Sequence, residues 1–235
     1  MIDSLKDNKT LSVLDEAECQ KWSQQVMDLK HVWIHRQKGL HGFWTLGRAS
    51  YLDGTSAHGD GISENEVIAQ NFGPLLSQVT EVLEKELGRS AYTCRDFALP
   101  GFHIYQGNEV FPTGLAYGGS VHLDKPHIQA EFKFEIEDVI SFTLPLRLPE
   151  KGAGLNYWDA IPDFLVDEVP SMTPLAQKWL GDHAHHHWYK IGEMLLHDGN
   201  TYHQISNLVP TTESDWRITL QGHGVLTEGR WLLFF

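Results

Sequence analysis

The stretch GGSVHLD, residues 118–124, places a histidine and an aspartate two positions apart. Side chains two positions apart in a β-strand point to the same face, so an extended backbone brings His122 and Asp124 together. One imidazole nitrogen and one carboxylate oxygen can then approach the same point. Two later segments, GNTYH at residues 199–203 and DWRITLQ at residues 215–221, carry further polar residues that suit this pair.

The first of these segments offers a third ligand, His203, after a turn that contains Gly199. Two histidines and one carboxylate on one face of a metal leave its other positions open, which is typical of non-haem Fe(II) that binds a co-substrate and O2. His197 and His223 are the alternative third ligands. We favour His203 because it follows the turn and leaves room for another turn before the strand that contains Arg217.

The second segment has one apolar and one polar strand face. The apolar face carries Trp216, Ile218 and Leu220, and the polar face carries Arg217, Thr219 and Gln221. A guanidinium inside a β-barrel costs free energy unless it meets an anion. Arg217 can bind a carboxylate through two parallel hydrogen bonds, and Thr219 can donate one more. A dicarboxylate with one end on the metal and the other on Arg217 fits both segments, whereas a structural ion pair is the alternative explanation for Arg217 alone.

The ordered set of His-x-Asp, His and Arg-x-Thr resembles the motifs of the Fe(II)- and 2-oxoglutarate-dependent oxygenases. The resemblance extends over residues 102–225, roughly the second half of the chain. Strand-like segments surround the motifs in the order expected for that family, at residues 102–107, 140–148, 154–158 and 192–196. The resemblance therefore implies a mainly β fold with flanking helices, whose core is a double-stranded β-helix, or jelly roll.

The resemblance also implies a chemistry. His122, Asp124 and His203 would bind Fe(II), and 2-oxoglutarate would chelate the metal while its distal carboxylate contacts Arg217 and Thr219. O2 is consumed, 2-oxoglutarate is converted to succinate and CO2, and hydroxylation of an unactivated C–H bond is the default outcome. Halogenases of this family have a small residue in place of the carboxylate ligand, so Asp124 favours a hydroxylase.

Other positions are candidates for contacts with the co-substrate or the substrate. Tyr105 lies on a strand that often reaches the co-substrate in the family, although core packing is the commoner role of such a tyrosine. Asn156 and Trp158 share one face of a strand that often faces the substrate there. Lys125 and Arg147 can each bind either an anionic substrate or a structural carboxylate, and Arg36 and Arg48 are further candidate anchors for an anionic group of the substrate. The expected substrate is a small, amino-acid-like metabolite.

The chain of 235 residues, 41% of them hydrophobic, is long enough for one domain with a sizeable core. Residues 1–92 predict a helical and mixed support region, in which Asp15 and Glu18 begin an amphipathic helix. Residues 93–235 contain the predicted β core, with a helical insertion near residues 159–182. The first ten residues are polar and are expected to fray.

Charge and composition limit the partners and the location. The formal net charge of −13 disfavours nucleic acid, because surfaces that bind nucleic acid are basic. Two cysteines, Cys19 and Cys94, predict no disulfide framework and a reduced, cytoplasmic setting. The first residues lack a signal pattern, and no apolar run approaches the ~20 residues that span a bilayer, so no membrane partner is expected. The histidine-rich run at residues 183–187 is interpreted as a solvated turn.

Two other functions fit parts of the pattern. A cupin-like metalloenzyme would use the same three ligands without 2-oxoglutarate and would leave Arg217 structural. A non-catalytic β-sandwich binding module would carry the histidines and the aspartate by coincidence, and it would bind no stoichiometric iron. The ordered set of motifs favours the oxygenase over both alternatives.

Overall fold

The computed structural model describes residues 8–38, 41–54, 63–106, 121–124, 132, 134–167, 169, 173–199, 201–206, 208–209 and 214–235. Within these residues the largest element is a nine-stranded, mostly antiparallel sheet. Seven of its strands are neighbours in the order β1 (Lys9–Ser12), β10 (Glu193–His197), β6 (Asp138–Arg147), β13 (Trp216–Thr227), β5 (Gly101–Gln106), β3 (His41–Leu46) and β2 (Ile34–Lys38). The strand β14 (Arg230–Phe234) pairs with β13 and, in parallel, with β4 (Ala91–Thr93).

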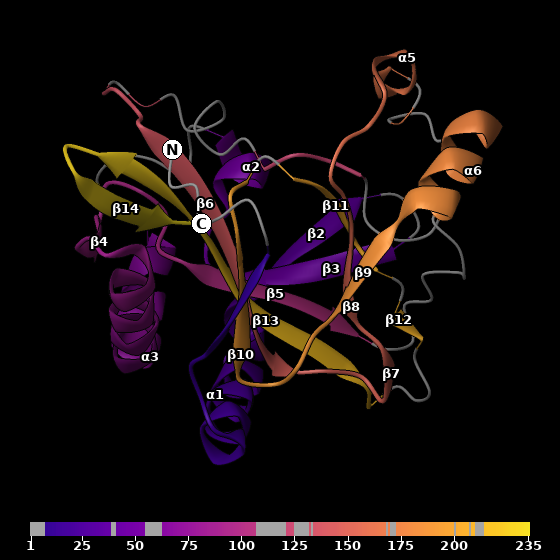
Figure 1. The fold of residues 1–235 in the computed structure, drawn as a ribbon. Coiled ribbons are helices and arrows are strands. Elements are labelled where there is room, and N and C mark those ends of the chain that lie inside the picture. The colour runs from indigo at the N-terminus through magenta and orange to yellow at the C-terminus, as the bar shows by residue number, and fades with distance from the viewer. Residues whose placement is uncertain are drawn as a thin grey trace.

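A second, three-stranded sheet lies opposite the middle of the large one (Figure 1). It consists of β11 (Tyr202–Ile205), β8 (Gly154–Trp158) and β9 (His185–Trp188), and β7 (Lys151–Gly152) pairs with β12 (Leu208–Val209) nearby. Leu155 of the small sheet belongs to one hydrophobic cluster with Leu195 of β10, and Ile205 packs against a cluster that contains Phe43 of β3. The inner faces of the two sheets therefore meet in a common interior, and the predicted mainly β fold is confirmed.

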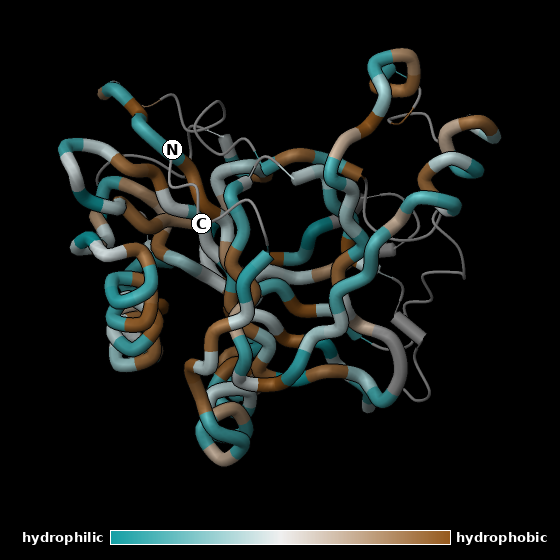
Figure 2. The backbone as a smooth tube through the Cα atoms, viewed as in Figure 1, coloured by the Kyte–Doolittle hydropathy of each residue, from teal (hydrophilic) through white to brown (hydrophobic). Residues whose placement is uncertain are grey.

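Helices cover the opposite face of the large sheet. The helix α1 (Glu16–Asp28) begins as predicted: the Asp15 side chain accepts a hydrogen bond from the backbone of Glu18, and the Glu18 carboxylate accepts one from the backbone of Asp15. The longer helix α3 (Ser63–Leu87) packs Phe72 on Phe102 of β5, with ring centroids 4.5 Å apart. Hydrophobic and hydrophilic residues alternate along both helices, as expected for helices with one buried face (Figure 2).

Shorter helices complete the described chain. They are η2 (Lys30–Val32), α2 (Ser50–Asp53), α5 (Asp163–Val166) and α6 (Pro174–His183). The predicted insertion contains α5 and α6, and α6 begins at Thr173, whose side chain accepts a hydrogen bond from the backbone of Ala176. None of the helices in the described residues is long and apolar enough to cross a membrane.

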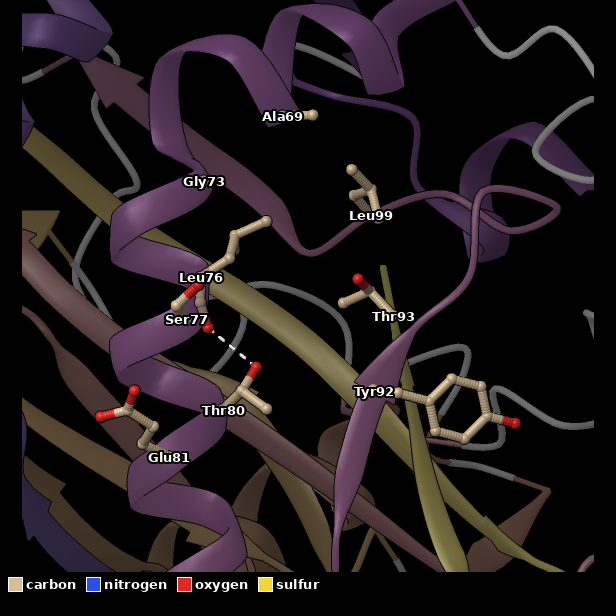
Figure 3. Close-up of a pocket in the computed structure, with 9 residues that line it drawn as sticks. All are labelled: Ala69, Gly73, Leu76, Ser77, Thr80, Glu81, Tyr92, Thr93 and Leu99. Carbon is tan, nitrogen blue, oxygen red and sulfur yellow. Dashed lines mark hydrogen bonds between the residues drawn. The ribbon is translucent and has the colours of Figure 1, made fainter.

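A groove of about 540 Å³ runs between α3 and β4, on the helix-covered side of the molecule (Figure 3). Its lining residues are Ala69, Gly73, Leu76, Ser77, Thr80, Glu81, Tyr92, Thr93 and Leu99. None of them is a predicted metal, co-substrate or substrate residue. The interior between the two sheets therefore holds the candidate site.

Candidate metal and co-substrate site

The structure brings His122, Asp124 and His203 together. The backbones of His122 and His203 pair with each other, with N–H to O distances of 3.0 and 2.9 Å. The Nε2 atom of His122 lies 3.6 Å from Oδ1 of Asp124, and the Nε2 atom of His203 lies 3.5 Å from Oδ2. One potential ligand atom from each residue lies within 4.8 Å of the others, close enough to surround a single ion. Among the described residues this is the only group of three or more His, Cys, Asp or Glu with such spacing.

The tautomer of His203 suits a ligand. Its Nδ1 atom lies 2.8 Å from the backbone oxygen of Thr201, and a carbonyl oxygen only accepts, so Nδ1 carries the proton. The lone pair of Nε2 then faces Asp124. A ligating histidine whose other nitrogen donates to a backbone carbonyl is held in its tautomer and ring orientation. His203 is thus held in the tautomer and orientation that a metal ligand needs.

His197 has the opposite tautomer. The backbone N–H of Gly199 donates to its Nδ1 atom at 3.3 Å, so in the neutral ring the proton is on Nε2. That Nε2 atom lies 3.8 Å from Oδ2 of Asp124 and presents a hydrogen rather than a lone pair. The tautomers therefore favour His203 over His197 as a potential metal ligand.

A fourth imidazole completes the surroundings of Asp124. The Nδ1 atom of His223 lies 4.0 Å from Oδ2 of Asp124 and 2.9 Å from the hydroxyl of Ser141. Burial alone would raise the pKa of Asp124, but the surrounding histidines, His203 foremost, outweigh it and hold that pKa well below its usual range. Burial lowers the pKa of His197 to about 3. The carboxylate is therefore ionised, as metal binding requires.

Arg217, on β13, lies in the interior, with only 1% of its surface exposed. Its Cζ atom lies 5.4 Å from the ring centre of Tyr105 and 5.3 Å from that of Tyr189. The two aromatic faces stabilise the cation but accept no conventional hydrogen bond. None of the three guanidinium nitrogens has a hydrogen-bond partner among the described residues.

Thr219 follows two positions later on the same face of β13 and is fully buried. Its hydroxyl also lacks a hydrogen-bond partner within the described part of the chain. A buried polar group without a partner costs about 1–3 kcal/mol. A carboxylate that accepts two hydrogen bonds from Arg217 and one from Thr219 would remove this cost, so the residues present fit the distal end of a dicarboxylate.

Tyr189 is a site residue that the sequence analysis missed. Burial raises its pKa, against the opposing charge of Arg217, and burial raises the pKa of Tyr105 to about 12. Both phenols therefore stay protonated at neutral pH. Asp124 also acts on the pKa of Tyr189, so this ring lies within electrostatic range of both Arg217 and the metal ligands.

Asn156 and Trp158 lie on the outer face of the small sheet. The side chain of Asn156 donates to Gln204 at 3.3 Å, and the indole N–H of Trp158 donates to the carbonyl of Leu180 on α6 at 3.0 Å. Trp158 is 1% exposed and belongs to the hydrophobic cluster that packs the insertion against this sheet. These two side chains therefore point away from the three potential metal ligands.

Tyr157 takes the inner position instead. It pairs directly with His203 on one side and with His185 on the other, so the three side chains share the inner face. The rings of Tyr157 and His185 stack with centroids 5.2 Å apart and an interplanar angle of 29°. The local sequence GLNYW contains polar or aromatic residues on both faces, so alternation alone does not show which face is inner.

The predicted cationic anchors have other partners or lie outside the description. Arg147 is half-buried and donates to the backbone oxygen of Ser214 at 3.0 Å. Arg36 forms two hydrogen bonds with Asp53, at 2.6 and 2.7 Å. Lys125 lies outside the described residues.

The comparison with known proteins supports the fold. No family model and no curated protein sequence matches the chain. Solved structures do match: an N-substituted L-amino acid dioxygenase from Burkholderia ambifaria AMMD is 14% identical over 97% of this chain and 86% of its own, with a TM-score of 0.54. The structure of that enzyme in complex with α-ketoglutarate gives a TM-score of 0.55.

Two further structures extend the likeness. The α-ketoglutarate-dependent epimerase SnoN from nogalamycin biosynthesis is 11% identical over 93% of this chain and 80% of its own, with a TM-score of 0.54. An oxidoreductase of the 2OG-Fe(II) oxygenase family from Burkholderia pseudomallei is 10% identical over 91% of this chain and 82% of its own, with a TM-score of 0.51. The chain thus has the predicted double-stranded β-helix fold of Fe(II)/2-oxoglutarate oxygenases. The likeness covers nearly its full length, more than the residues 102–225 to which the sequence motifs pointed.

Proposed function

We propose that the protein is an Fe(II)- and 2-oxoglutarate-dependent oxygenase that hydroxylates an unactivated C–H bond of a small, amino-acid-like metabolite. One observation carries the proposal: the described residues combine a His-Asp-His group with Arg217 and Thr219, two buried residues whose side-chain polar atoms have no partner among the described residues. The His-Asp-His group and the pair Arg217 and Thr219 each have an ordinary structural explanation when taken alone. Together they match a ligand that chelates a metal at one end and presents a carboxylate at the other.

The metal half depends on His122, Asp124 and His203. Asp124 supplies an ionised oxygen because its pKa lies well below its usual range, and the Nδ1–H of His203 is fixed by Thr201 so that Nε2 is free to bind. With Fe(II), 2-oxoglutarate and O2 bound, the site would place one oxygen atom in the substrate C–H bond and the other in succinate, with release of CO2. Because Asp124 fills the carboxylate position, hydroxylation is favoured over halogenation.

The co-substrate half depends on Arg217 and Thr219. Arg217 would orient the distal carboxylate by two parallel hydrogen bonds. The Cζ atom of Arg217 lies over the rings of Tyr105 and Tyr189, 5.4 and 5.3 Å from their centres. Because Arg217 is buried, water does not compete for these hydrogen bonds. The chain's own contribution is thus to orient the co-substrate and to exclude water from it.

The substrate would approach from the side of His122. Its side chain is 42% exposed, whereas that of His203 is 7% exposed, so the ligand group is open on the His122 side. Tyr157 lies next to His203 on the inner face and joins Arg147 and Lys125 as a proposed substrate contact. The fold is shared by a dioxygenase of N-substituted L-amino acids and by an epimerase, so it accommodates small substrates of different chemistry.

The test is to add Fe(II) and then 2-oxoglutarate to the protein without oxygen and to record the visible metal-to-ligand charge-transfer band. We expect a band with the wild type and none with Asp124→Ala, while Asp182→Ala, which removes an exposed carboxylate on α6, keeps it. Iron binding without a band would favour the cupin-like enzyme. Neither iron nor a band would contradict the metal site and favour the binding module.

A further inference from the structure

His103 and Tyr51 form a hydrogen-bonded pair beside the proposed co-substrate site. The hydroxyl of Tyr51, on α2, lies 2.6 Å from the Nε2 atom of His103, on β5. The imidazole is 4% exposed and is fixed by aromatic neighbours: its ring centre lies 5.4 Å from that of Phe43 and 5.1 Å from that of Phe235. The ring is therefore held in one orientation.

The position of His103 follows from the pairing of β13 with β5. His103 is directly opposite Thr219, and Tyr105 is directly opposite Arg217. Burial lowers the pKa of His103 well below its usual range, and the charges of Arg217 and Asp124 both act on it. The ring is thus neutral and lies within electrostatic range of the guanidinium and of the metal ligands.

The pair also determines which nitrogen of His103 carries the proton. Burial raises the pKa of Tyr51 well above its usual range, so its hydroxyl stays protonated and can donate to Nε2. The proton of the neutral ring is then on Nδ1. With the proton on Nε2 instead, Nδ1 would be an acceptor without a donor near Arg217. No nitrogen of the Arg217 guanidinium donates to Nδ1 or to any other described atom.

The Nδ1–H group is consequently a buried donor, on a side chain that shares one face of the paired strands with Arg217 and Thr219. It has no hydrogen-bond partner among the described residues, like the guanidinium and the Thr219 hydroxyl. A carboxylate offers about four acceptor sites on its two oxygens. Arg217 accounts for two of them and Thr219 for a third, so one site remains.

We propose that His103 contacts the co-substrate by donating from Nδ1 to the distal carboxylate of 2-oxoglutarate, and that Tyr51 is the positioning residue that keeps the proton on Nδ1. This inference rests on the function proposed above, and it adds a residue and a tautomer to the site. The group that recognises the carboxylate then consists of Arg217, Thr219 and His103, on two paired strands.

The experiment compares two ligands and two variants of His103. The ligands are 2-oxoglutarate and 2-oxopentanoate, which has a methyl group in place of the distal carboxylate, and each is titrated anaerobically into the Fe(II)-loaded protein to obtain dissociation constants. His103→Asn retains an amide nitrogen near the position of Nδ1, whereas His103→Gln places it near Nε2. We expect His103→Gln to weaken 2-oxoglutarate binding about tenfold, as for one hydrogen bond to a charged acceptor, with 2-oxopentanoate binding unchanged. We expect His103→Asn to restore most of the affinity.

Other results would overturn the inference. An equal loss for both ligands would show that His103 only supports the fold, and no loss for either would show that it does not touch the carboxylate. Tyr51→Phe keeps the imidazole and is expected to weaken 2-oxoglutarate binding about threefold, because it removes the neighbour that fixes the tautomer. Tyr92→Phe on β4 is the control, and an effect equal to that of Tyr51→Phe would contradict the positioning role.

Failure of the proposed function has a different signature. In that case the wild type itself would bind 2-oxoglutarate no better than 2-oxopentanoate, or would bind neither. The inference about His103 fails alone under two conditions. Arg217→Met loses the wild-type preference for 2-oxoglutarate over 2-oxopentanoate, and His103→Gln keeps that preference.

Discussion

The Nδ1–H of His203 donates to the carbonyl oxygen of Thr201, whereas the Nδ1 of His197 accepts from the N–H of Gly199. The two imidazoles are only 4.9 Å apart between ring centres, yet they present opposite groups to Asp124. In the neutral ring, His203 presents the lone pair of Nε2, whereas His197 presents a hydrogen. This difference favours His203 over His197 as a potential metal ligand.

The first prediction concerns iron content. His203→Gln should abolish stoichiometric Fe(II) binding because it removes a ligand. His197→Gln should retain iron with an affinity about 10–100-fold lower, as for a residue that orients a ligand. Metal analysis after anaerobic loading and gel filtration measures both, and a greater loss in His197→Gln than in His203→Gln would reverse the assignment.

The second prediction concerns Arg217. Arg217→Met removes the charge and keeps most of the side-chain volume, so we expect the ligand-free variant to be as stable as the wild type, because the guanidinium has no hydrogen-bond partner among the described residues. Saturating 2-oxoglutarate should raise the Tm of the Fe(II)-loaded wild type by mass action but not that of the variant.

The matched control for Arg217 is Arg230→Met. Arg230 also lies over a tyrosine ring, 4.8 Å from the centre of Tyr92, but it is exposed and belongs to β14. This variant should keep the full thermal shift with 2-oxoglutarate. A structural ion pair at Arg217 would instead show as a large loss of stability in ligand-free Arg217→Met.

The third prediction concerns acid stability without metal. Burial holds the pKa of His197 at about 3, below the usual value for histidine of about 6.5, so the unfolded chain binds a proton in this range that the folded chain does not. The free energy of unfolding should therefore fall as the pH drops from about 6.5, by up to about 1.4 kcal/mol per pH unit from this residue. Urea unfolding of metal-free wild type and His197→Gln between these pH values measures the effect, and the variant should show the shallower slope.

His203 acts in the opposite direction. Burial alone would lower its pKa, but Asp124 outweighs burial and raises it, so its stabilising protonation is fully present below the unfolded pKa and is lost as the pH rises through the folded pKa. This contribution changes only above about pH 6.5, the usual pKa of histidine, so the wild type should lose stability there as the pH rises and His203→Gln should lose less. Identical pH dependence of all three proteins in both ranges would contradict the electrostatic account of these imidazoles.

The fourth prediction separates the two faces of the small sheet. Trp158→Ala should destabilise the fold by about 3–5 kcal/mol, because it leaves a cavity in the cluster beneath α6. Binding of 2-oxoglutarate at a temperature where the variant is folded should be unchanged. Trp188→Ala, at an indole residue that is 66% exposed, is the control and should change stability little.

The sequence predicted the parts of the site that depend on short spacing. His122 and Asp124 are two positions apart, and Arg217 and Thr219 are two positions apart, so the alternation of strand faces alone brings each pair together. The start of α1 also depends on neighbouring residues alone, because the side chains of Asp15 and Glu18 each accept a hydrogen bond from the backbone N–H of the other. These features need no knowledge of how distant segments pack.

Other features depend on contacts between segments far apart in the chain. Tyr189 reaches Arg217, and Tyr51 reaches His103, without any local pattern that marks them. The prediction that the first ten residues fray was wrong at Lys9 and Thr10, which pair with Leu196 and Leu195 at the edge of the large sheet. Edge pairing of a polar segment is decided by its partner strand, which the segment's own composition does not reveal.

The difference in depth between Arg217 and His122 has a consequence for the order of events during turnover. Only 1% of the surface of Arg217 is exposed, whereas the side chain of His122 is 42% exposed. Under the proposed function, a dicarboxylate that enters from the exposed side of His122 would pass the ligand group before it reaches Arg217, and a substrate bound there afterwards would block its way out. Steady-state kinetics should therefore follow a compulsory order, with 2-oxoglutarate arriving first and succinate departing last.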